Sequence, residues 1–278
     1  MKQPRALAGA VDDVLDRAVV GAALMAGGAN VIMQLARPGV GHGVVESKVD
    51  SGNVFKHPLK RTRTTLTYLA VASFGTDEER RLYRRAVNKS HAQVRSSAAS
   101  PVQYNAFDPE LQLWVAACLY RGVEDTYQAF VGPLDKQTTD ALYASSATFG
   151  TTLQVPPEMW PADRAAFEEY WTEALDQVHI DDTVRKYLHA IATLKYLPKY
   201  LRRIFGPFNK FVTTGFLPPR FRSEMRLDWS AADQHRFDRM TSRVAAVTKR
   251  LPGPVRRFPY NLCLWDMRRR IKAGRPLV

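Results

Sequence analysis

A single histidine lies inside a strongly basic segment, RRAVNKSHAQVR, at residues 84–95. The segment predicts a helix with one apolar stripe, whose members are separated by steps of four, four and three: Tyr83, Val87, His91 and Val94. The cationic side chains fall on the remaining arc of the same helix: Arg80, Arg81, Arg84, Arg85, Lys89 and Arg95. A histidine on an apolar face is either a hydrogen-bonded core residue or a metal ligand.

The preceding segment, HPLKRTRTTLTYLAVASFG, carries a second set of polar side chains on one helix face. Arg61, Thr65 and Tyr68 are separated by four and three residues, which places them together. A turn at residues 75–76 joins the two helices, so we expect a hairpin in which Arg61, Thr65 and His91 approach one internal cavity. In the plainer interpretation Arg61 is solvated, Thr65 has no role and His91 is a core residue. The spacing alone favours that interpretation.

The elements that must position these residues are predicted to be helices nearly throughout: residues 10–36, 58–74, 77–97, 109–131, 135–148, 161–178, 181–205, 230–250 and 259–273. Thr76, three residues before Glu79, has the pattern of a capping box. Asp108 followed by Pro109 is typical of a helix start. No segment alternates in the manner of a strand, so no sheet is expected. The fold class is therefore all-α, as one large helical domain spanning residues 1–278, and the alternative is a separate lobe for the C-terminal third.

Composition places the chain among ordinary globular proteins. Its 278 residues are 45% hydrophobic and 24% charged, which suits a chain that buries a real core. Cys118 and Cys263 are expected to be buried, unpaired residues in a reducing compartment. An apolar stretch at 19–33 is too short to span a bilayer and has acidic residues before it, unlike a signal peptide. We therefore expect a cytoplasmic protein.

Charge is spread unevenly along the chain. Residues 1–184 hold 18 Lys and Arg against 22 Asp and Glu, whereas residues 185–278 hold 22 against 5. The basic third also contains aromatic residues, as in KYLPKYLRRIFGPFNKF at 195–211. A solvated basic face is the plain interpretation. Peripheral contact with an anionic membrane surface is the functional one, and we favour it over nucleic-acid binding because no DNA-binding motif is present.

Three ordered motifs in the region from about residue 36 to 157 give the chain a family resemblance. They are an arginine four residues before a threonine with a later FG (Arg61, Thr65, Tyr68, Phe74-Gly75), V-N-x-x-H-x-x-V (Val87, Asn88, His91, Val94) and Y-x-A-x-D-P-E-L-x-L-W-V (Tyr104, Ala106, Asp108, Pro109, Glu110, Leu111, Leu113, Trp114, Val115). In this order and spacing they resemble the bacterial rubber oxygenases (latex-clearing proteins) and the fungal farnesyl-cleaving oxygenase of mycophenolic acid biosynthesis.

The resemblance implies a globin-like helical fold around a non-covalently held haem b. By position, His91 is then the proximal iron ligand, and Arg61 and Thr65 line the haem pocket on its other side. Tyr68, Val87 and Val94 of the same motifs are expected to contact the cofactor. The absence of a CxxCH motif fits a haem held by packing and ligation alone.

The chain departs from the family pattern at several positions. Thr64 stands where some rubber oxygenases have lysine, Ala116 where many relatives have histidine, and Ser47 where many place another histidine. Glu46 is near a glutamate proposed as a base in the rubber enzymes, but the local alignment slips by one residue, so we leave Glu46 out of the predicted site. These departures argue against rubber as the substrate.

Our first hypothesis is therefore a haem-dependent oxygenase that uses dioxygen on a hydrophobic, isoprenoid-like or lipid-like alkene, by oxidative cleavage of a C=C bond. Arg61 and Thr65 would be its catalytic residues. The alternatives are a non-catalytic haem or lipid carrier and, less favoured, a basic nucleic-acid-binding protein. The other histidines are not assigned to iron: His42 and His57 are expected at the surface, and His179 and His189 to contact substrate or to pack. Motifs for hydrolysis, nucleotide binding or a kinase are absent.

Overall fold

The computed structural model describes residues 14–15 and 17–278, and over these residues the all-α prediction is confirmed. A single antiparallel bridge, between Arg95 and Asn105, is the only β pairing among them. In chain order, with η for 3₁₀ turns, the elements are η1 (Gly21–Ala26), α2 (Gly27–Leu35), α3 (Pro38–Val45), η2 (Asp50–Gly52), α4 (Pro58–Phe74), α5 (Asp77–His91), α6 (Pro109–Phe130), α7 (Lys136–Ser146), α8 (Thr148–Thr151), η3 (Pro157–Met159), α9 (Arg164–Asp176), α10 (Asp182–Ala192), α11 (Lys199–Phe216), α12 (Pro219–Glu224), α13 (Ala231–Arg250), α14 (Gly253–Arg256) and α15 (Tyr260–Lys272).

Two predicted helices are shorter or more divided than expected. The helix predicted at 77–97 ends at His91, because the chain beyond it pairs with residues 104–106 through hydrogen bonds to and from Val94 and Ser96. The helix predicted at 181–205 is wrong as one element: Leu194 adopts a left-handed φ of 54°, and Pro198 is the residue that precedes α11. Proline removes a backbone donor and disfavours helix for the residue before it, so the break is local in origin.

The N-terminal helix predicted at residues 10–36 is a 3₁₀ turn followed by α2, and α3 starts at Pro38. The part of that prediction at residues 10–13 and 16 lies outside the described residues. The apolar stretch packs inside, as expected: Ile32 and Met33 are buried. No helix of the described residues is both long enough and apolar enough to cross a membrane.

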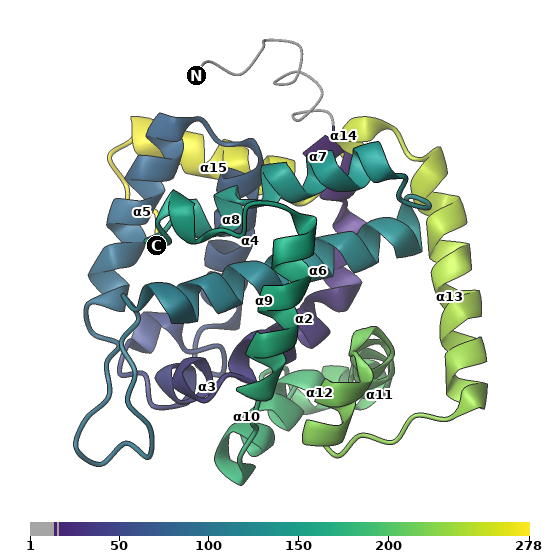
Figure 1. Ribbon diagram of the computed structural model, residues 1–278, viewed down its shortest axis with the longest axis horizontal. Coiled ribbons are helices and arrows are strands. Elements are labelled where there is room, and N and C mark those ends of the chain that lie inside the picture. The colour runs from purple at the N-terminus through teal and green to yellow at the C-terminus, as the bar shows by residue number, and fades with distance from the viewer. Residues whose placement is uncertain (1–13, 16) are drawn as a thin grey trace.

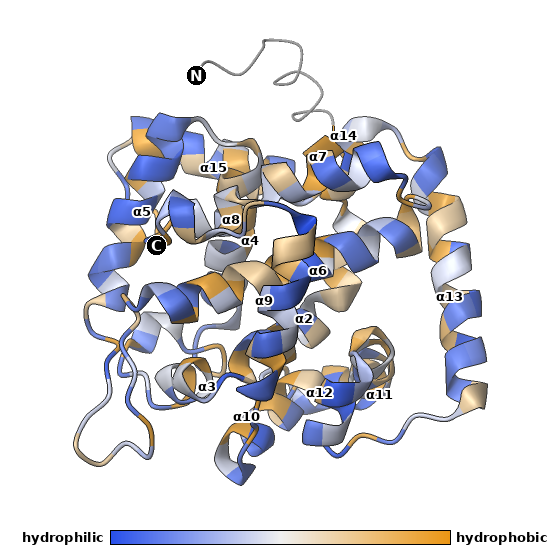
Figure 2. Ribbon diagram, viewed as in Figure 1, coloured by the Kyte–Doolittle hydropathy of each residue, from blue (hydrophilic) through white to orange (hydrophobic). Residues whose placement is uncertain are grey.

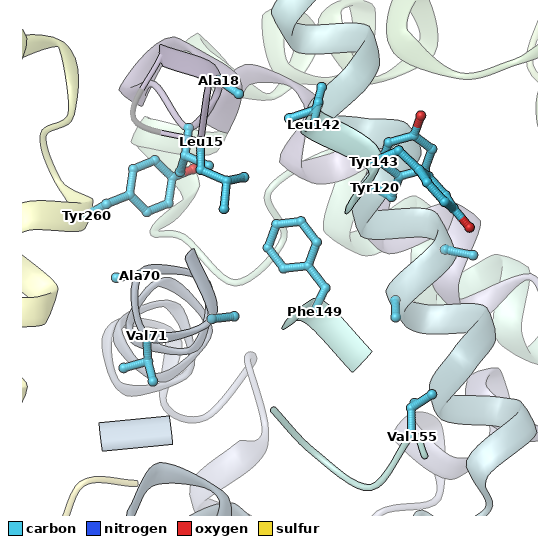
Figure 3. Close-up of a cluster of buried hydrophobic side chains, with 14 of the residues drawn as sticks. Leu15, Ala18, Ala70, Val71, Tyr120, Leu142, Tyr143, Phe149, Val155 and Tyr260 are labelled. Carbon is cyan, nitrogen blue, oxygen red and sulfur yellow. The ribbon is translucent and has the colours of Figure 1, made fainter. Parts of the chain in front are cut away.

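The long helix α6 crosses the molecule, with α9 in front of it and α13 along one edge (Figure 1). It separates two clusters of buried side chains. The first joins α4, α6, α7, α8 and α15, and Figure 3 shows Phe149 between the α4 residues Ala70 and Val71 on one side and Tyr120 on the other. The second is built around Trp114, whose indole stacks on Trp171 at 5.2 Å between ring centroids.

The basic C-terminal third packs against the earlier helices over the described residues. Helix α15 packs against α4, and α13 packs against α6. Arg268 of α15 donates to both carboxylate oxygens of Glu79 on α5, at 2.7 and 3.2 Å. Cys118 and Cys263 are both buried and free, as predicted.

Candidate functional site

The hairpin of α4 and α5 brings the predicted site residues onto adjoining helices. Gly75 permits the tight turn, because a Cβ there would lie 2.6 Å from the Val71 carbonyl oxygen. Thr76 then starts α5 with the predicted capping box to Glu79. Further along, the Tyr83 hydroxyl donates to the Thr64 carbonyl at 2.6 Å, which fixes α5 against α4. The turn and this bond set Arg61 and His91 at the same end of the hairpin.

His91 is the last residue of α5 and is partly buried. Its Nδ1 is enclosed without a hydrogen-bond partner, and Nε2 also makes no hydrogen bond with the described residues. Desolvation, followed by the charge of Arg61, lowers the pKa of His91 to about 4, so the ring is neutral at pH 7. A buried ring nitrogen without a partner is costly unless a ligand satisfies the ring, and only a neutral imidazole binds a metal.

Arg61 combines solvent access with enclosure. Its side chain is accessible, yet desolvation by the surrounding protein lowers its pKa, which nearby Tyr187 and Tyr83 oppose by raising it. A guanidinium that lines an internal hollow would be both accessible to solvent and desolvated by the protein around it. Over the described residues the guanidinium has neither a hydrogen bond nor an ion pair, so its five donors remain free for a bound group.

Thr65 lies one turn beyond Arg61 on α4, with an accessible side chain whose hydroxyl makes no hydrogen bond with the described residues. Arg61 and His91 are close enough for the arginine charge to act on the imidazole. Arg61 and Thr65 thus share one face of α4 and Arg61 lies near His91, while a shared cavity of the three residues stays a prediction. Sequence alone could not distinguish this from three unrelated surface and core residues.

The other predicted cofactor contacts have different surroundings. Tyr68 packs on the first buried cluster and its hydroxyl donates to the carbonyl of Phe149, so that hydroxyl is already engaged. Val87 packs on the same cluster. Val94 lies beyond the end of α5, and its Cγ1 would lie 3.7 Å from a Cβ added at Gly43. The expectation that Val94 continues the helical stripe of His91 is therefore wrong, since the helix ends first.

A side-chain network explains why asparagine precedes the histidine by three residues. Asn88 accepts from the amide of Gln154, and Gln154 in turn exchanges hydrogen bonds with Gln112 of α6, at 2.6 and 2.9 Å. Gln112 also donates to the Ala106 carbonyl at 2.6 Å. The network ties the end of α5 to α6 and to the segment after α8, and so orients the turn of helix that carries His91.

Glu46, left out of the predicted site, is held by three donors. His42 Nδ1, the Ser100 hydroxyl and the Tyr104 hydroxyl lie 2.8, 2.6 and 2.9 Å from its carboxylate oxygens. Burial alone would raise the pKa of Glu46, but these hydrogen bonds outweigh burial and lower it. Tyr104 belongs to the third sequence motif, so its hydrogen bond connects that motif to Glu46. A polar hydroxyl at Tyr104 was the available sequence signal for this contact.

His42 is buried, so its expected place at the surface is wrong. Its Nε2 lies 2.6 Å from an Asp181 oxygen, while Nδ1 faces Glu46. The four-residue spacing of His42 and Glu46 on a helix was the available signal, but Asp181 is distant in sequence. His57 is exposed beside Asp50, as expected.

The remaining histidines lie apart from this pair. His179 is mostly exposed, and His189 is hydrogen-bonded to the Met225 carbonyl at 3.0 Å. Over the described residues, no three His, Cys, Asp or Glu side chains are placed to share a metal ion. A haem needs one protein ligand, since the porphyrin supplies the donors in its plane.

Comparisons with known proteins agree with the motifs. The sequence model of the family described as "ER-bound oxygenase mpaB/B'/Rubber oxygenase, catalytic domain" matches residues 17–246. Uncharacterized proteins of Mycobacterium bovis and Mycobacterium tuberculosis are each 56% identical to the chain over 250 residues, which cover 90% of this chain and 98% of each relative. No solved structure was found to match the chain.

Proposed function

The chain belongs to the mpaB and rubber oxygenase catalytic-domain family, and from that membership we propose that it is a haem b-dependent oxygenase acting on a hydrophobic alkene. The observation that carries the proposal is His91: a neutral imidazole with an enclosed, unpartnered nitrogen, near a desolvated arginine that has no counter-ion among the described residues. A core histidine with no ligand would leave that nitrogen unsatisfied at a cost of about 1–3 kcal/mol.

The residues present fit the cofactor. His91 would hold the iron through a ring nitrogen, and the apolar side chains beside it would exclude water. The haem would supply dioxygen binding and activation, chemistry that no side chain of the chain can perform. Neither ring nitrogen of His91 has a hydrogen-bond partner among the described residues, so either nitrogen is free to bind the iron, and the ring packs against Phe107 at 6.3 Å between ring centroids.

Arg61 and Thr65 would act on the bound groups. The guanidinium supplies a fixed positive charge that favours negative charge nearby, and the Thr65 hydroxyl can donate to an oxygen or accept from water. The family suggests an isoprenoid-like or lipid-like substrate and oxidative cleavage of its C=C bond to carbonyl products.

The first experiment is an absorption spectrum of the purified protein before and after addition of hemin, for the wild type, His91→Ala and His57→Ala. His57 is the matched control, because it is an exposed histidine whose ring pairs with the carboxylate of Asp50. We expect a strong Soret band that survives in His57→Ala and is lost or greatly weakened in His91→Ala, with the helical circular dichroism unchanged. An unaltered haem spectrum in His91→Ala would overturn the ligand assignment.

A second measurement separates an oxygenase from a carrier that binds haem or lipid without turnover. The haem-loaded protein is mixed with isoprenoid alkenes in an oxygen electrode. Dioxygen consumption with formation of carbonyl products supports the oxygenase, whereas binding without consumption supports the carrier.

A further inference from the structure

The first half of α11 holds four large apolar side chains in solvent. Tyr200, Ile204, Phe205 and Phe208 are exposed to 67, 66, 50 and 54%. Three of them, at 200, 204 and 208, recur every four residues and so form one stripe along the helix. Single exposed apolar residues are common on protein surfaces, but a contiguous patch of this kind marks a contact surface.

The exposure is a consequence of how α11 is anchored. On its other side Gly206 is buried against the α10–α11 turn, where a Cβ would lie 3.0 Å from the Thr193 carbonyl oxygen. Asn209 donates to the Ala192 carbonyl at 2.9 Å. Val212 and Thr213 are buried further along. The helix is therefore anchored on one side, and its apolar stripe faces solvent because it lies away from that anchored side.

Charge around this stripe has one sign. Residues 183–223 contain nine lysines and arginines and no aspartate or glutamate. Lys199, Arg203 and Lys210 are exposed next to the stripe, and none of the three forms an ion pair with the described residues. Figure 2 shows hydrophilic and hydrophobic residues mixed along α11, at the lower side of the molecule beside α10 and α12.

We propose that the outer face of α11 docks on the surface of an anionic phospholipid bilayer. The lysines and arginines contact the lipid phosphates, and Ile204 and the aromatic rings insert at the headgroup boundary, where aromatic side chains are favoured. A nucleic acid is the weaker match, because an exposed isoleucine in the middle of the stripe gains nothing from phosphates or bases. A protein partner would have to bring both acidic and apolar groups to the same narrow face.

The docking face is linked to the candidate site by aromatic side chains. Tyr196, in the turn before α11, packs on Phe55 at 6.3 Å between ring centroids, and Phe55 packs on Tyr187 at 5.2 Å. Tyr187 is close enough to Arg61 to affect its pKa. Docking through α11 would therefore place the bilayer near the turn whose Tyr196 begins this series of contacts toward Arg61. This consequence, unlike the docking itself, rests on the proposed function.

Vesicle sedimentation tests the proposal with the full chain and without haem, so failure of the haem assignment leaves the result unaffected. One set of vesicles is phosphatidylcholine alone, and the other contains phosphatidylcholine and phosphatidylglycerol in a two-to-one ratio. We expect binding to the anionic set only, weakened by added salt. Ile204→Ser with Phe208→Ser should reduce the binding constant about tenfold or more, since two apolar side chains no longer insert.

Lys199→Gln with Arg203→Gln should weaken binding and flatten its dependence on salt. The matched control is Val247→Ser, which removes an apolar side chain that is 60% exposed on α13 and should leave binding unchanged. Melting temperatures verify that each variant is folded, which is expected because every substituted side chain is exposed. Equal binding by wild type and the Ile204/Phe208 variant, or tight binding to DNA with none to anionic vesicles, would overturn the proposal.

Discussion

Arg61 has a solvent-accessible side chain that is nevertheless desolvated by the surrounding protein, and no carboxylate of the described residues forms an ion pair with it. Desolvation lowers its pKa, and the groups that act against this are the hydroxyls of Tyr187 and Tyr83. An enclosed charge with free donors is unfavourable in the empty protein and becomes favourable when an electron-rich group binds. The free donors of Arg61 are therefore consistent with the binding role that we propose for it.

Arg61→Ala should retain part of the haem but change how the haem binds carbon monoxide, because the charge on that side of the pocket is lost. The carbon monoxide difference spectrum and the rate of dioxygen consumption measure this. Arg81→Ala removes an exposed arginine from α5 and should change neither. Spectra and rates of Arg61→Ala that match the wild type would count against a role for Arg61.

Asp125 is a partly buried acid with no hydrogen bond to the described residues. Desolvation, and then the charge of Glu124, raise its pKa to about 6. The unfolded chain releases this proton near pH 4, so the folded state holds a proton that the unfolded state lacks between about pH 4 and 6. Stability from this group is therefore present below about pH 4 and is lost as the pH rises through 6.

Asp125→Asn should raise the free energy of unfolding at pH 7.5 by about 1–3 kcal/mol, since the neutral amide avoids burying a charge. The gain should disappear below about pH 4, where the native aspartate is protonated in both states. Urea unfolding over a pH series measures it. A gain that does not change with pH would show that packing, and not ionisation, is responsible.

At the scale of elements, His42 joins α3 to the start of α10. One ring nitrogen faces Glu46 and the other faces Asp181, and the pKa values of both carboxyls are lowered although burial alone would raise them. With a carboxylate oxygen within hydrogen-bond distance of each ring nitrogen, the imidazole bridges the two carboxylates. The arrangement also fixes Glu46 beside Tyr104, which brings the loop before α6 into the same cluster.

His42→Ala should destabilise the protein by about 2–4 kcal/mol at pH 7, because two carboxylates lose their shared partner. The carboxyls have lowered pKa values, so their stabilisation is present above about pH 4 and is lost as the pH falls through their folded values. The variant should therefore lose stability less steeply in acid than the wild type. His57→Ala, at an exposed pair, should cost under about 0.5 kcal/mol in the same unfolding experiment.

At the scale of the whole molecule, Trp114 connects the central helix to the second buried cluster. Its ring stacks on Trp171 and lies near Phe221, and its indole N–H donates to the Gln34 carbonyl at 3.0 Å. It therefore joins α6 to α2, α9 and α12. The tryptophan of the third motif is thus a packing residue. The motif therefore reflects helix packing as well as the location of the candidate site.

Trp114→Phe should lower the free energy of unfolding by about 2–3 kcal/mol, through a smaller buried ring and a carbonyl left without its donor. The control substitution, Trp265→Phe, replaces a tryptophan that is exposed on α15 and should lower the free energy of unfolding by less than about 0.5 kcal/mol. Equal effects of the two substitutions would mean that the indole of Trp114 carries no special packing role.

The sequence by itself determined the helices with strong local signals. The bounds of α4, the capping box at Thr76, the start of α6 at Pro109 and the free, buried cysteines were all predictable. Helix periodicity, caps and prolines act within a few residues, so they can be read without the fold. The family was also predictable, because its motifs have a fixed order and spacing.

Tertiary structure alone decided which distant groups meet. His42 finds Asp181 across 139 residues, Gln154 reaches Asn88 and Gln112, and the ring nitrogens of His91 are left without partners. The end of α5 at His91 likewise depends on the pairing of residues 94–96 with 104–106. Burial and long-range hydrogen bonding depend on how helices pack, and helix packing is not encoded in any local window of the chain.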